Sequence, residues 1–237
     1  MTSIRLSQAL SRSSTATQPS ELLRRWLSVS VAAIGLLLAA PLMAAIAFGI
    51  KLTSRGPVFF KQTRIGLDRR GGKHSLDNSR RGTDCGGKPF MIYKFRTMSS
   101  NGNGHSSSGH GSQQVWAQPN DPRVTRIGRL LRLYRLDELP QLLNVLIGDM
   151  DVVGPRPEQP AIFARLRTQI ERYQERQRVR PGITGWAQIN LKYDTSVESV
   201  RTKVSYDLEY VERQSVFEDL RIMLRTFPVV VFKRGAW

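Results

Sequence analysis

The sequence predicts an α+β fold that is mainly helical, with a re-entrant membrane helix hairpin and a small cytosolic domain of short strands and amphipathic interfacial helices. Three observations lead to this prediction. Residues 27–50 form an uncharged run, apolar residues further along recur at helical spacing, and only two short stretches have the composition of strands. A chain of 237 residues with 40% apolar content can bury one core, so we expect a single domain with appendages.

The N-terminal part of the chain predicts a tail and then a membrane anchor. Residues 1–20 are rich in Ser, Thr, Gln and Arg, which favours a disordered tail. The uncharged run in residues 27–50 exceeds the roughly 20 apolar residues that a membrane helix needs. We therefore assign residues 21–55 to a membrane anchor.

Charges and a proline indicate how the anchor meets the bilayer. Basic residues stand on both sides of the run: Arg24, Arg25, Lys51 and Arg55. Basic flanks stay on the cytoplasmic side, so both ends are drawn to the same face. Pro41 inside the run removes a helical hydrogen bond and predicts a kink. These features favour a re-entrant helix broken at Pro41, and a plain spanning helix with a tolerated proline is the alternative.

Residues 56–237 should form the main domain, which begins with two strand candidates. Residues 58–60 follow a Gly-Pro turn, and residues 90–95 are rich in aromatic and β-branched side chains. Residues 66–88 lack an apolar period, and residues 99–114 are dominated by Ser, Gly, Asn and His. Both stretches predict flexible loops.

Helical patterns fill the rest of the domain. Residues 121–150 combine apolar residues at helical spacing with an arginine at every third position from 123 to 135, which predicts an amphipathic helix. One further helix is expected over residues 158–178, and residues 196–237 repeat the helical apolar spacing. An apolar face beside basic residues suits a membrane surface, and packing on the core explains it equally well.

The charge balance points to an anionic partner. The chain has 36 Lys and Arg against 19 Asp and Glu, a formal net charge of +17. Nucleic acid, anionic lipid and phosphorylated small substrates all fit such a surplus. Most aromatic residues lie in apolar periods rather than among exposed cations, so we predict no nucleic-acid binding. Cys85 is the only cysteine, which excludes an internal disulfide and favours a reducing, cytosolic setting.

Two adjacent carboxylates stand out as candidates for chemistry. Asp137 and Glu138 precede Pro140, and because proline is tolerated in a first helical turn, a helix should begin close to Asp137. Asp137 could simply be the N-cap of that helix. Alternatively, an aspartate at a helix start stays ionised and can act as a nucleophile or as a ligand of Mg²⁺, a hard cation that binds carboxylates together with substrate phosphates.

Further residues suit the binding of phosphates and a base. Lys94 and Arg96 are two apart near the second strand, so they should share one face and could grip a diphosphate; ordinary surface cations are the alternative. Arg156 lies between two prolines, which would present its guanidinium with little entropy to lose. Gln188 follows a rigid turn and either meets a nucleobase or closes the core.

Long strings in the chain resemble the bacterial sugar transferase family, the monotopic phosphoglycosyl transferases that act on undecaprenyl phosphate. The strings follow one another from the anchor onward, and several long strings in order are more specific than any one motif. They include Lys94-Phe95-Arg96-Thr97-Met98, Leu136-Asp137-Glu138-Leu139-Pro140 and Gly154-Pro155-Arg156-Pro157, with others at residues 56–66, 121–125 and 180–186.

The resemblance implies a reaction and its residues. It implies that Asp137, with Glu138 as its partner, attacks the β-phosphate of a UDP-sugar, releases UMP and carries the sugar phosphate to undecaprenyl phosphate. Mg²⁺ is the implied cofactor, Arg156 is implicated at the phosphates, and Asp207 is a second, weaker metal-ligand candidate. Residues 56–237 then correspond to the catalytic domain, at the cytoplasmic face of the inner membrane.

Two features depart from the family pattern, and an alternative function is also compatible with the sequence. The insertion at residues 69–87 and Asp151, where members of the family often have serine, depart from the pattern, and neither has an interpretation. A non-catalytic scaffold that binds anionic lipid is the alternative function. Membrane lipids are expected partners either way, the sugar is not identified, and a homodimer remains open.

Overall fold

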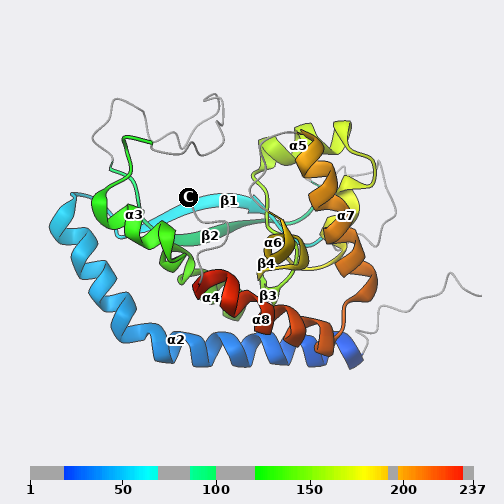
Figure 1. Ribbon diagram of the computed structural model, residues 1–237, viewed down its shortest axis with the longest axis horizontal. Coiled ribbons are helices and arrows are strands. Elements are labelled where there is room, and N and C mark those ends of the chain that lie inside the picture. Colours follow the sequence, from blue (N-terminus) through cyan, green and yellow to red (C-terminus); the bar gives the residue numbers. More distant parts are fainter. Residues whose placement is uncertain (1–18, 69–85, 100–120, 192–196, 232–237) are drawn as a thin grey trace, which may run out of the picture.

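The computed structural model describes residues 19–68, 86–99, 121–191 and 197–231. The predicted tail up to residue 18 and most of the two predicted loops lie outside this part of the chain. The described residues are mainly helical, with one long apolar helix near the N-terminus and four short strands (Figure 1). The mainly helical α+β prediction is thereby confirmed in outline.

The long helix α2 covers Pro19–Thr53. In Figure 1 it runs along one side of the domain and then bends to follow the domain upward. Within the described residues, it is the one helix long and apolar enough to cross a membrane. The helix is continuous through Pro41 rather than divided into two helices there, and it bends along its length. A proline removes one hydrogen bond and bends a helix, and the packed domain beside α2 supports both of its arms.

Two small sheets form the centre of the domain. Both strand candidates are confirmed as strands, β1 (Phe59–Ile65) and β2 (Pro89–Phe95), and the structure pairs them antiparallel. Strand β3 (Asp151–Val153) pairs in parallel with β4 (Gly182–Thr184). Strands β3 and β4 were not predicted, because a strand of three residues is too short to display an alternating pattern.

The helices surround these sheets (Figure 1). The predicted helix in residues 121–150 is divided into α3 (Arg126–Leu133), the 3-10 turn η1 (Leu136–Glu138) and α4 (Gln141–Ile147). The C-terminal helical region consists of α7 (Val197–Arg213) and α8 (Val216–Val231), and α6 (Trp186–Asn190) precedes it.

The prediction of a single helix over residues 158–178 was wrong. The structure has α5 (Pro160–Gln169) and a 3-10 turn η2 (Tyr173–Arg178). Ile170 is extended and buried, and Arg172 has a φ of 59°, in the left-handed region. Burial of Ile170 and Tyr173 in one cluster outweighs the helical propensity of the residues between them.

Two arginines tie the first arm of α2 to the domain. Arg24 donates hydrogen bonds to Asp219 at 2.9 Å and to the hydroxyl of Tyr210 at 2.6 Å, and all three side chains are buried. Arg25 pairs with Asp151 at 2.7 Å. This pair gives Asp151 a structural role, since it fixes β3 to α2.

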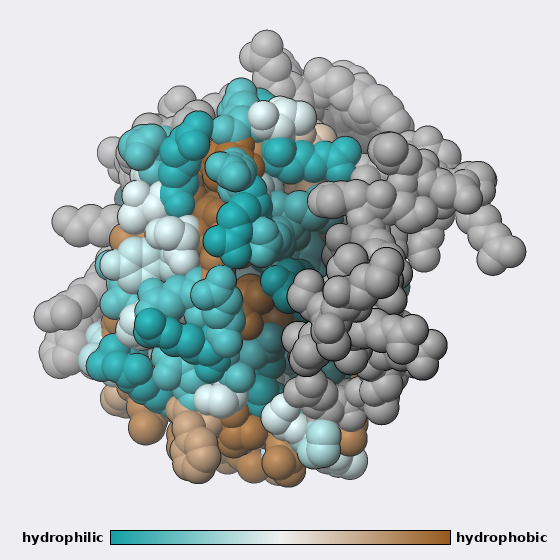
Figure 2. Space-filling view, turned by 90° about the vertical axis from the view of Figure 1, so that its right-hand side faces the viewer, coloured by the Kyte–Doolittle hydropathy of each residue, from teal (hydrophilic) through white to brown (hydrophobic). Residues whose placement is uncertain are grey.

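Apolar side chains gather on one side of the molecule. In Figure 2 hydrophobic residues lie along the lower edge, the side on which α2 and α8 run in Figure 1, and hydrophilic residues cover the body above. The exposed members come from three helices: Ile34, Leu37, Leu38, Leu42 and Phe48 of α2, Leu143, Leu146 and Ile147 of α4, and Phe217, Leu220, Leu224 and Phe227 of α8. Exposed apolar side chains that gather in this way indicate contact with a membrane or a protein. We call this surface the apolar face.

Candidate active site

The Asp137–Glu138 pair lies in the turn between α3 and α4. Thr125 caps α3, and its hydroxyl accepts a hydrogen bond from the amide of Gly128 at 2.9 Å. Arg135 then adopts a φ of 56°, which reverses the chain into the 3-10 turn η1. Such a backbone costs a non-glycine residue about 1–3 kcal/mol and persists only where the surrounding structure enforces it.

The expected helix start is displaced from Asp137. Helix α4 begins at Gln141, and Pro140 is its N-cap residue rather than a residue of its first turn. Asp137 is not the N-cap, and the alternative that made it a helix cap was therefore wrong. Its carboxylate instead projects from a 3-10 turn.

Asn144 fixes α4 and the turn onto the sheet. Its amide nitrogen donates to the carbonyl of Met91 at 2.7 Å, and its amide oxygen accepts from the backbone N–H of Tyr93 at 3.1 Å. Asn144 is fully buried, so these bonds form in a low dielectric and are costly to lose. They hold the Asp137–Glu138 turn next to Lys94.

Glu138 is the centre of a polar cluster. Its carboxylate accepts hydrogen bonds from Lys94 at 2.6 Å and from both terminal nitrogens of Arg156, at 2.6 and 3.3 Å. Arg156 also donates to the amide oxygen of Gln188 at 3.4 Å. The structure therefore brings together four predicted site residues that come from four separate segments of the chain.

A glycine-rich junction positions Arg156. The amide of Gly154 donates to the carbonyl of Thr184 at 2.9 Å, and the amide of Gly182 donates to the carbonyl of Pro155 at 3.0 Å. A Cβ on Gly154 would lie 2.3 Å from the carbonyl oxygen of Arg180, so only glycine allows the two segments to meet so closely. The loop that carries Arg156 is thus clamped to β4.

The two adjacent carboxylates have opposite environments. Within the described part of the chain, the Asp137 carboxylate makes no hydrogen bond and no ion pair, whereas Glu138 is held by Lys94 and Arg156. Burial would raise the pKa of Glu138, but the charges of Arg156 and Lys94 outweigh it and hold that pKa well below its ordinary value. Burial and the charge of Glu138 raise the pKa of Asp137. Glu138 is thus an anion fixed by two cations, whereas the Asp137 carboxylate has no such partner among the described residues.

Arg96 does not join this cluster. Its guanidinium donates to the backbone carbonyls of Arg55 at 2.6 Å and Ser54 at 2.8 Å, at the end of α2. The expectation that Lys94 and Arg96 grip one diphosphate is not supported, because Arg96 follows the last residue of β2 and its side chain turns to the helix end. Cations at a helix C-terminus bind its free carbonyls favourably.

Asp207 is also separated from the cluster. It forms an ion pair with Arg176 at 2.8 Å, and both side chains are almost completely buried. Burial raises the pKa of Asp207 despite the charge of Arg176. Its assignment as a metal ligand was based on resemblance alone, and this pairing with a buried cation argues against it.

A buried ionic network that the sequence did not predict lies beneath Arg156. Arg176 donates to the carbonyl of Arg156 at 3.0 Å, and Arg64 donates to that of Pro157 at 3.1 Å. Glu158 pairs with Lys203 at 3.0 Å. Glu158 and Arg176 belong to a stretch in which arginines and glutamates alternate, which normally indicates a solvated face, so the pattern did not single them out.

The charge of Glu158 should contribute strongly to stability. Burial would raise its pKa, but Lys203 and Arg176 lower it from 4.5 to about 2. Because the folded-state pKa lies below the unfolded one, the stabilisation is present above pH 4.5 and is lost as the pH falls toward 2. We expect Glu158→Gln to lower the free energy of unfolding at neutral pH by roughly 3 kcal/mol, measured by denaturant unfolding.

The control for this prediction is Glu198→Gln, because Glu198 is 83% exposed and its partner Arg201 lies 3.7 Å away at the surface. That variant should match the parent chain. The difference between Glu158→Gln and the parent should shrink below pH 4.5. A loss of stability that is the same at every pH would contradict the electrostatic explanation.

The described residues contain no group of three or more His, Cys, Asp and Glu side chains that could enclose a metal ion. A metal bound by the described residues alone would therefore need further ligands from its substrate. Asp137 suits this arrangement because its carboxylate has no protein partner among the described residues, and Mg²⁺ is usually bound by one or two carboxylates plus substrate phosphates.

Comparison with known proteins gives consistent results. Residues 19–233 match the family model described as bacterial sugar transferase. The chain is 41% identical over 207 residues to a UDP-glucose:undecaprenyl-phosphate glucose-1-phosphate transferase of Escherichia coli, covering 86% of this chain and 39% of that protein. A protein of Caulobacter vibrioides with the same name is 41% identical over 219 residues, covering 92% of this chain and 73% of that protein.

A third relative differs in its named sugar. The UDP-N-acetylgalactosamine-undecaprenyl-phosphate N-acetylgalactosaminephosphotransferase of Aeromonas hydrophila is 39% identical over 214 residues, covering 90% of this chain and 45% of that protein. The chain thus spans less than half the length of the Escherichia and Aeromonas relatives. The family model covers almost the whole chain, including the segment that carries Asp137 and Glu138. The chain therefore belongs to the bacterial sugar transferase family.

Proposed function

We propose that this chain is a phosphoglycosyl transferase that moves a sugar 1-phosphate from a UDP-sugar to undecaprenyl phosphate and releases UMP, as a first step in exopolysaccharide or glycoconjugate synthesis. The observation that carries the proposal is the contrast within the carboxylate pair. Glu138 is fixed by two cations, and Asp137 beside it is free of protein partners within the described residues. The relatives named above act on UDP-sugars and undecaprenyl phosphate.

The geometry is suited to a covalent route in two steps. In the first, a carboxylate oxygen of Asp137 attacks the β-phosphorus of the UDP-sugar, and the bond from that phosphorus to the bridging oxygen breaks, releasing UMP. In the second, an oxygen of undecaprenyl phosphate attacks the same phosphorus and releases the Asp137 carboxylate. Lys94 and Arg156, already held beside Asp137 by Glu138, would stabilise the charge that develops on the phosphoryl oxygens.

Mg²⁺ is the cofactor that we propose. Asp137 is the residue that would contact it, with the diphosphate of the substrate supplying the other ligands. The ion would neutralise charge on the diphosphate. Asp207 is left out of this proposal because its carboxylate is buried against Arg176.

The test is a direct assay of the purified chain. We expect it to release UMP from a UDP-sugar when undecaprenyl phosphate and Mg²⁺ are present, and to form a lipid-linked sugar phosphate in equal amount. UDP-glucose and UDP-N-acetylgalactosamine should be assayed first, since the relatives are named for these donors. A chain that binds anionic vesicles and releases no UMP from any UDP-sugar would be a scaffold instead.

We further infer that α2 enters and leaves the membrane on one side, the cytoplasmic face of the inner membrane. Near its start, Arg24 and Arg25 bind Asp219 and Asp151 of the domain. At its other end, Arg96 of the domain binds the carbonyls of residues 54 and 55. A helix with both ends attached to one domain supports the re-entrant arrangement over a spanning one.

Cysteine labelling should give the same result at both ends of α2. In a Cys85→Ser background, Leu22→Cys and Lys51→Cys should both resist an impermeant maleimide applied to spheroplasts and react in inverted membrane vesicles. Leu37→Cys, in the exposed apolar part of α2, should react weakly from either side because it lies in hydrocarbon. Labelling of positions 22 and 51 from opposite sides would establish a spanning helix.

A further inference from the structure

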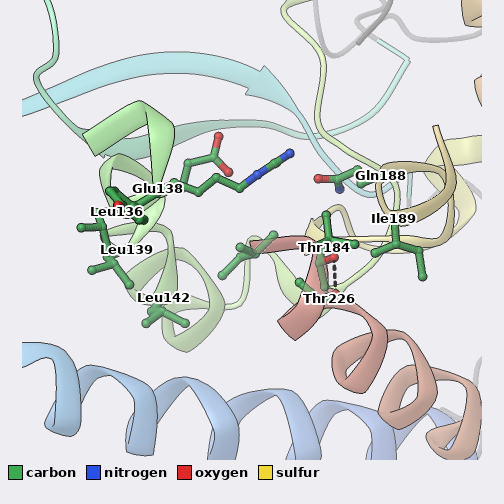
Figure 3. Close-up of a pocket in the computed structure, with 12 residues that line it drawn as sticks. Leu136, Glu138, Leu139, Leu142, Thr184, Gln188, Ile189 and Thr226 are labelled. Atoms are coloured by element: carbon green, nitrogen blue, oxygen red, sulfur yellow. Dashed lines mark hydrogen bonds between the residues drawn. The ribbon is translucent and has the colours of Figure 1, made fainter. Parts of the chain in front are cut away.

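A cavity of about 240 Å³ lies directly beside the Asp137–Glu138 turn. Figure 3 shows it between two walls: Leu136, Leu139 and Leu142 on one side, and Thr184, Ile189 and Thr226 on the other. Glu138 and Gln188 lie at its upper edge, and α2 passes below. The cavity therefore has a polar end at the catalytic pair and an apolar body.

The two threonines do not make the body polar. Their hydroxyls lie 2.8 Å apart and bond to each other, and the hydroxyl of Thr226 also donates to the carbonyl of Ile222 at 2.7 Å. Hydroxyls that are already bonded present mainly their methyl groups to a ligand. A uracil ring or a sugar would need hydrogen-bond partners that these walls do not offer.

The cavity is directed toward the apolar face. Leu142 in its wall lies against α2, since a Cβ on Gly35 would be 3.4 Å from Leu142 Cδ1. Val229 and Thr226 bring in α8, which exposes Leu224 and Phe227 on the apolar face. A ligand in the cavity could thus extend from the catalytic pair to the surface that we expect to meet lipid.

The polar end is equipped for an anion. Arg135 lines the cavity in its left-handed conformation. The side-chain amide nitrogen of Gln188 is buried, and the described part of the chain offers it no hydrogen-bond acceptor. A buried donor without an acceptor is unfavourable, and a phosphate oxygen would satisfy it.

We propose that this cavity binds the isoprene units next to the phosphate of the lipid acceptor, and that it thereby aligns the phosphate with Asp137. A polyprenyl phosphate has this pattern, an anionic head attached directly to a branched hydrocarbon chain. The inference rests on the proposed function and adds to it where the acceptor binds and which part of the acceptor is recognised.

Binding can be measured without catalysis. A prenyl phosphate with a diazirine on its first isoprene unit should crosslink the full-length chain at peptides covering residues 134–142, 183–189 or 226–229. Undecaprenyl phosphate should compete, whereas inorganic phosphate and phosphatidylglycerol vesicles should not. Crosslinking elsewhere, or equal competition by phosphatidylglycerol or phosphate, would overturn the proposal in favour of a general lipid or anion site.

Variants that fill the cavity should affect the two half-reactions differently. The first is formation of the sugar phosphate on Asp137, and the second is its transfer to undecaprenyl phosphate. Val229→Trp, and Ile189→Trp as a second filling variant from another helix, should reduce transfer to undecaprenyl phosphate at least 10-fold, through a higher KM for the lipid. Labelling of the protein by the UDP-sugar without lipid should stay within twofold of the parent. Leu224→Trp is the matched control, because Leu224 is on the same helix as Val229, is 68% exposed and does not line the cavity.

The outcomes distinguish this inference from the proposed function. An equal fall in both half-reactions, or no fall in either, would overturn the acceptor cavity. If the parent chain crosslinks in the cavity but releases no UMP, the phosphoglycosyl transferase proposal fails and the lipid site stands.

Discussion

Asp137→Asn should abolish sugar phosphate transfer without weakening the fold. An amide cannot form the covalent bond to phosphorus, so we expect UMP release and labelling of the protein to fall on the order of 10⁴-fold. Burial and the neighbouring charge of Glu138 raise the pKa of Asp137, which means that its ionised form is disfavoured in the folded state. Thermal unfolding of Asp137→Asn should therefore occur at the same temperature as in the parent chain or slightly higher.

The matched control for this prediction is Asp149→Asn. Asp149 is near the end of α4, and its partner Lys88, 3.2 Å away, is more than half exposed. An exposed pair of this kind contributes little, so activity and stability should both stay close to the parent. If Asp137→Asn still becomes labelled by the UDP-sugar, another group is the nucleophile.

The elements that the sequence predicted well are those with long patterns. The apolar run of α2, the aromatic strand β2 and the helical spacing of α8 extend over enough residues to identify them. Those it did not predict depend on distant contacts. Strands β3 and β4 have three residues each, and the break after α5 follows from the burial of Ile170. Local propensity contains no information about such partners.

The candidate site shows the same division. Asp137, Glu138, Lys94, Arg156 and Gln188 could be selected as residue types suited to phosphate chemistry, and the structure gathers them. Their division of tasks could not be predicted, because it depends on which carboxylate receives the cations. Strand spacing did not predict the position of Arg96 correctly. Arg96 lies one residue beyond the end of β2, and its side chain contacts the end of α2 instead of the side of Lys94.

In the proposed mechanism, the second carboxylate, Glu138, has the task of holding the cations in place. Lys94 and Arg156 would repel each other, and burial disfavours the charge of Lys94, whose pKa is lowered despite Glu138. The negative charge of Glu138 offsets both the repulsion between the two cations and the cost of burying Lys94. The cations therefore stay close together before any substrate arrives. Preorganised charge of this kind stabilises a transition state without reorganisation at the moment of reaction.

Arg156 should be the residue least tolerant of replacement after Asp137. Arg156→Met removes a cation from the reacting phosphate and leaves Glu138 with Lys94 alone, so we expect kcat/KM for the UDP-sugar to fall about 10²–10³-fold. Arg156→Lys retains the charge but cannot form the paired contact with Glu138, and it should still lose about 10-fold. Steady-state UMP release measures both, and Arg213→Met, at a 71% exposed arginine on α7, is the control.

The activity of Arg156→Lys relative to that of Arg156→Met shows whether Arg156 acts through its charge alone or also through its geometry. A planar guanidinium bound to both Glu138 oxygens fixes its own position and that of the carboxylate, whereas an ammonium fixes neither. Arg156→Met should also unfold at a lower temperature, because a buried carboxylate has lost a partner. If Arg156→Lys were as active as the parent chain, charge alone would suffice, and the rigid presentation by Gly154, Pro155 and Pro157 would have no catalytic purpose.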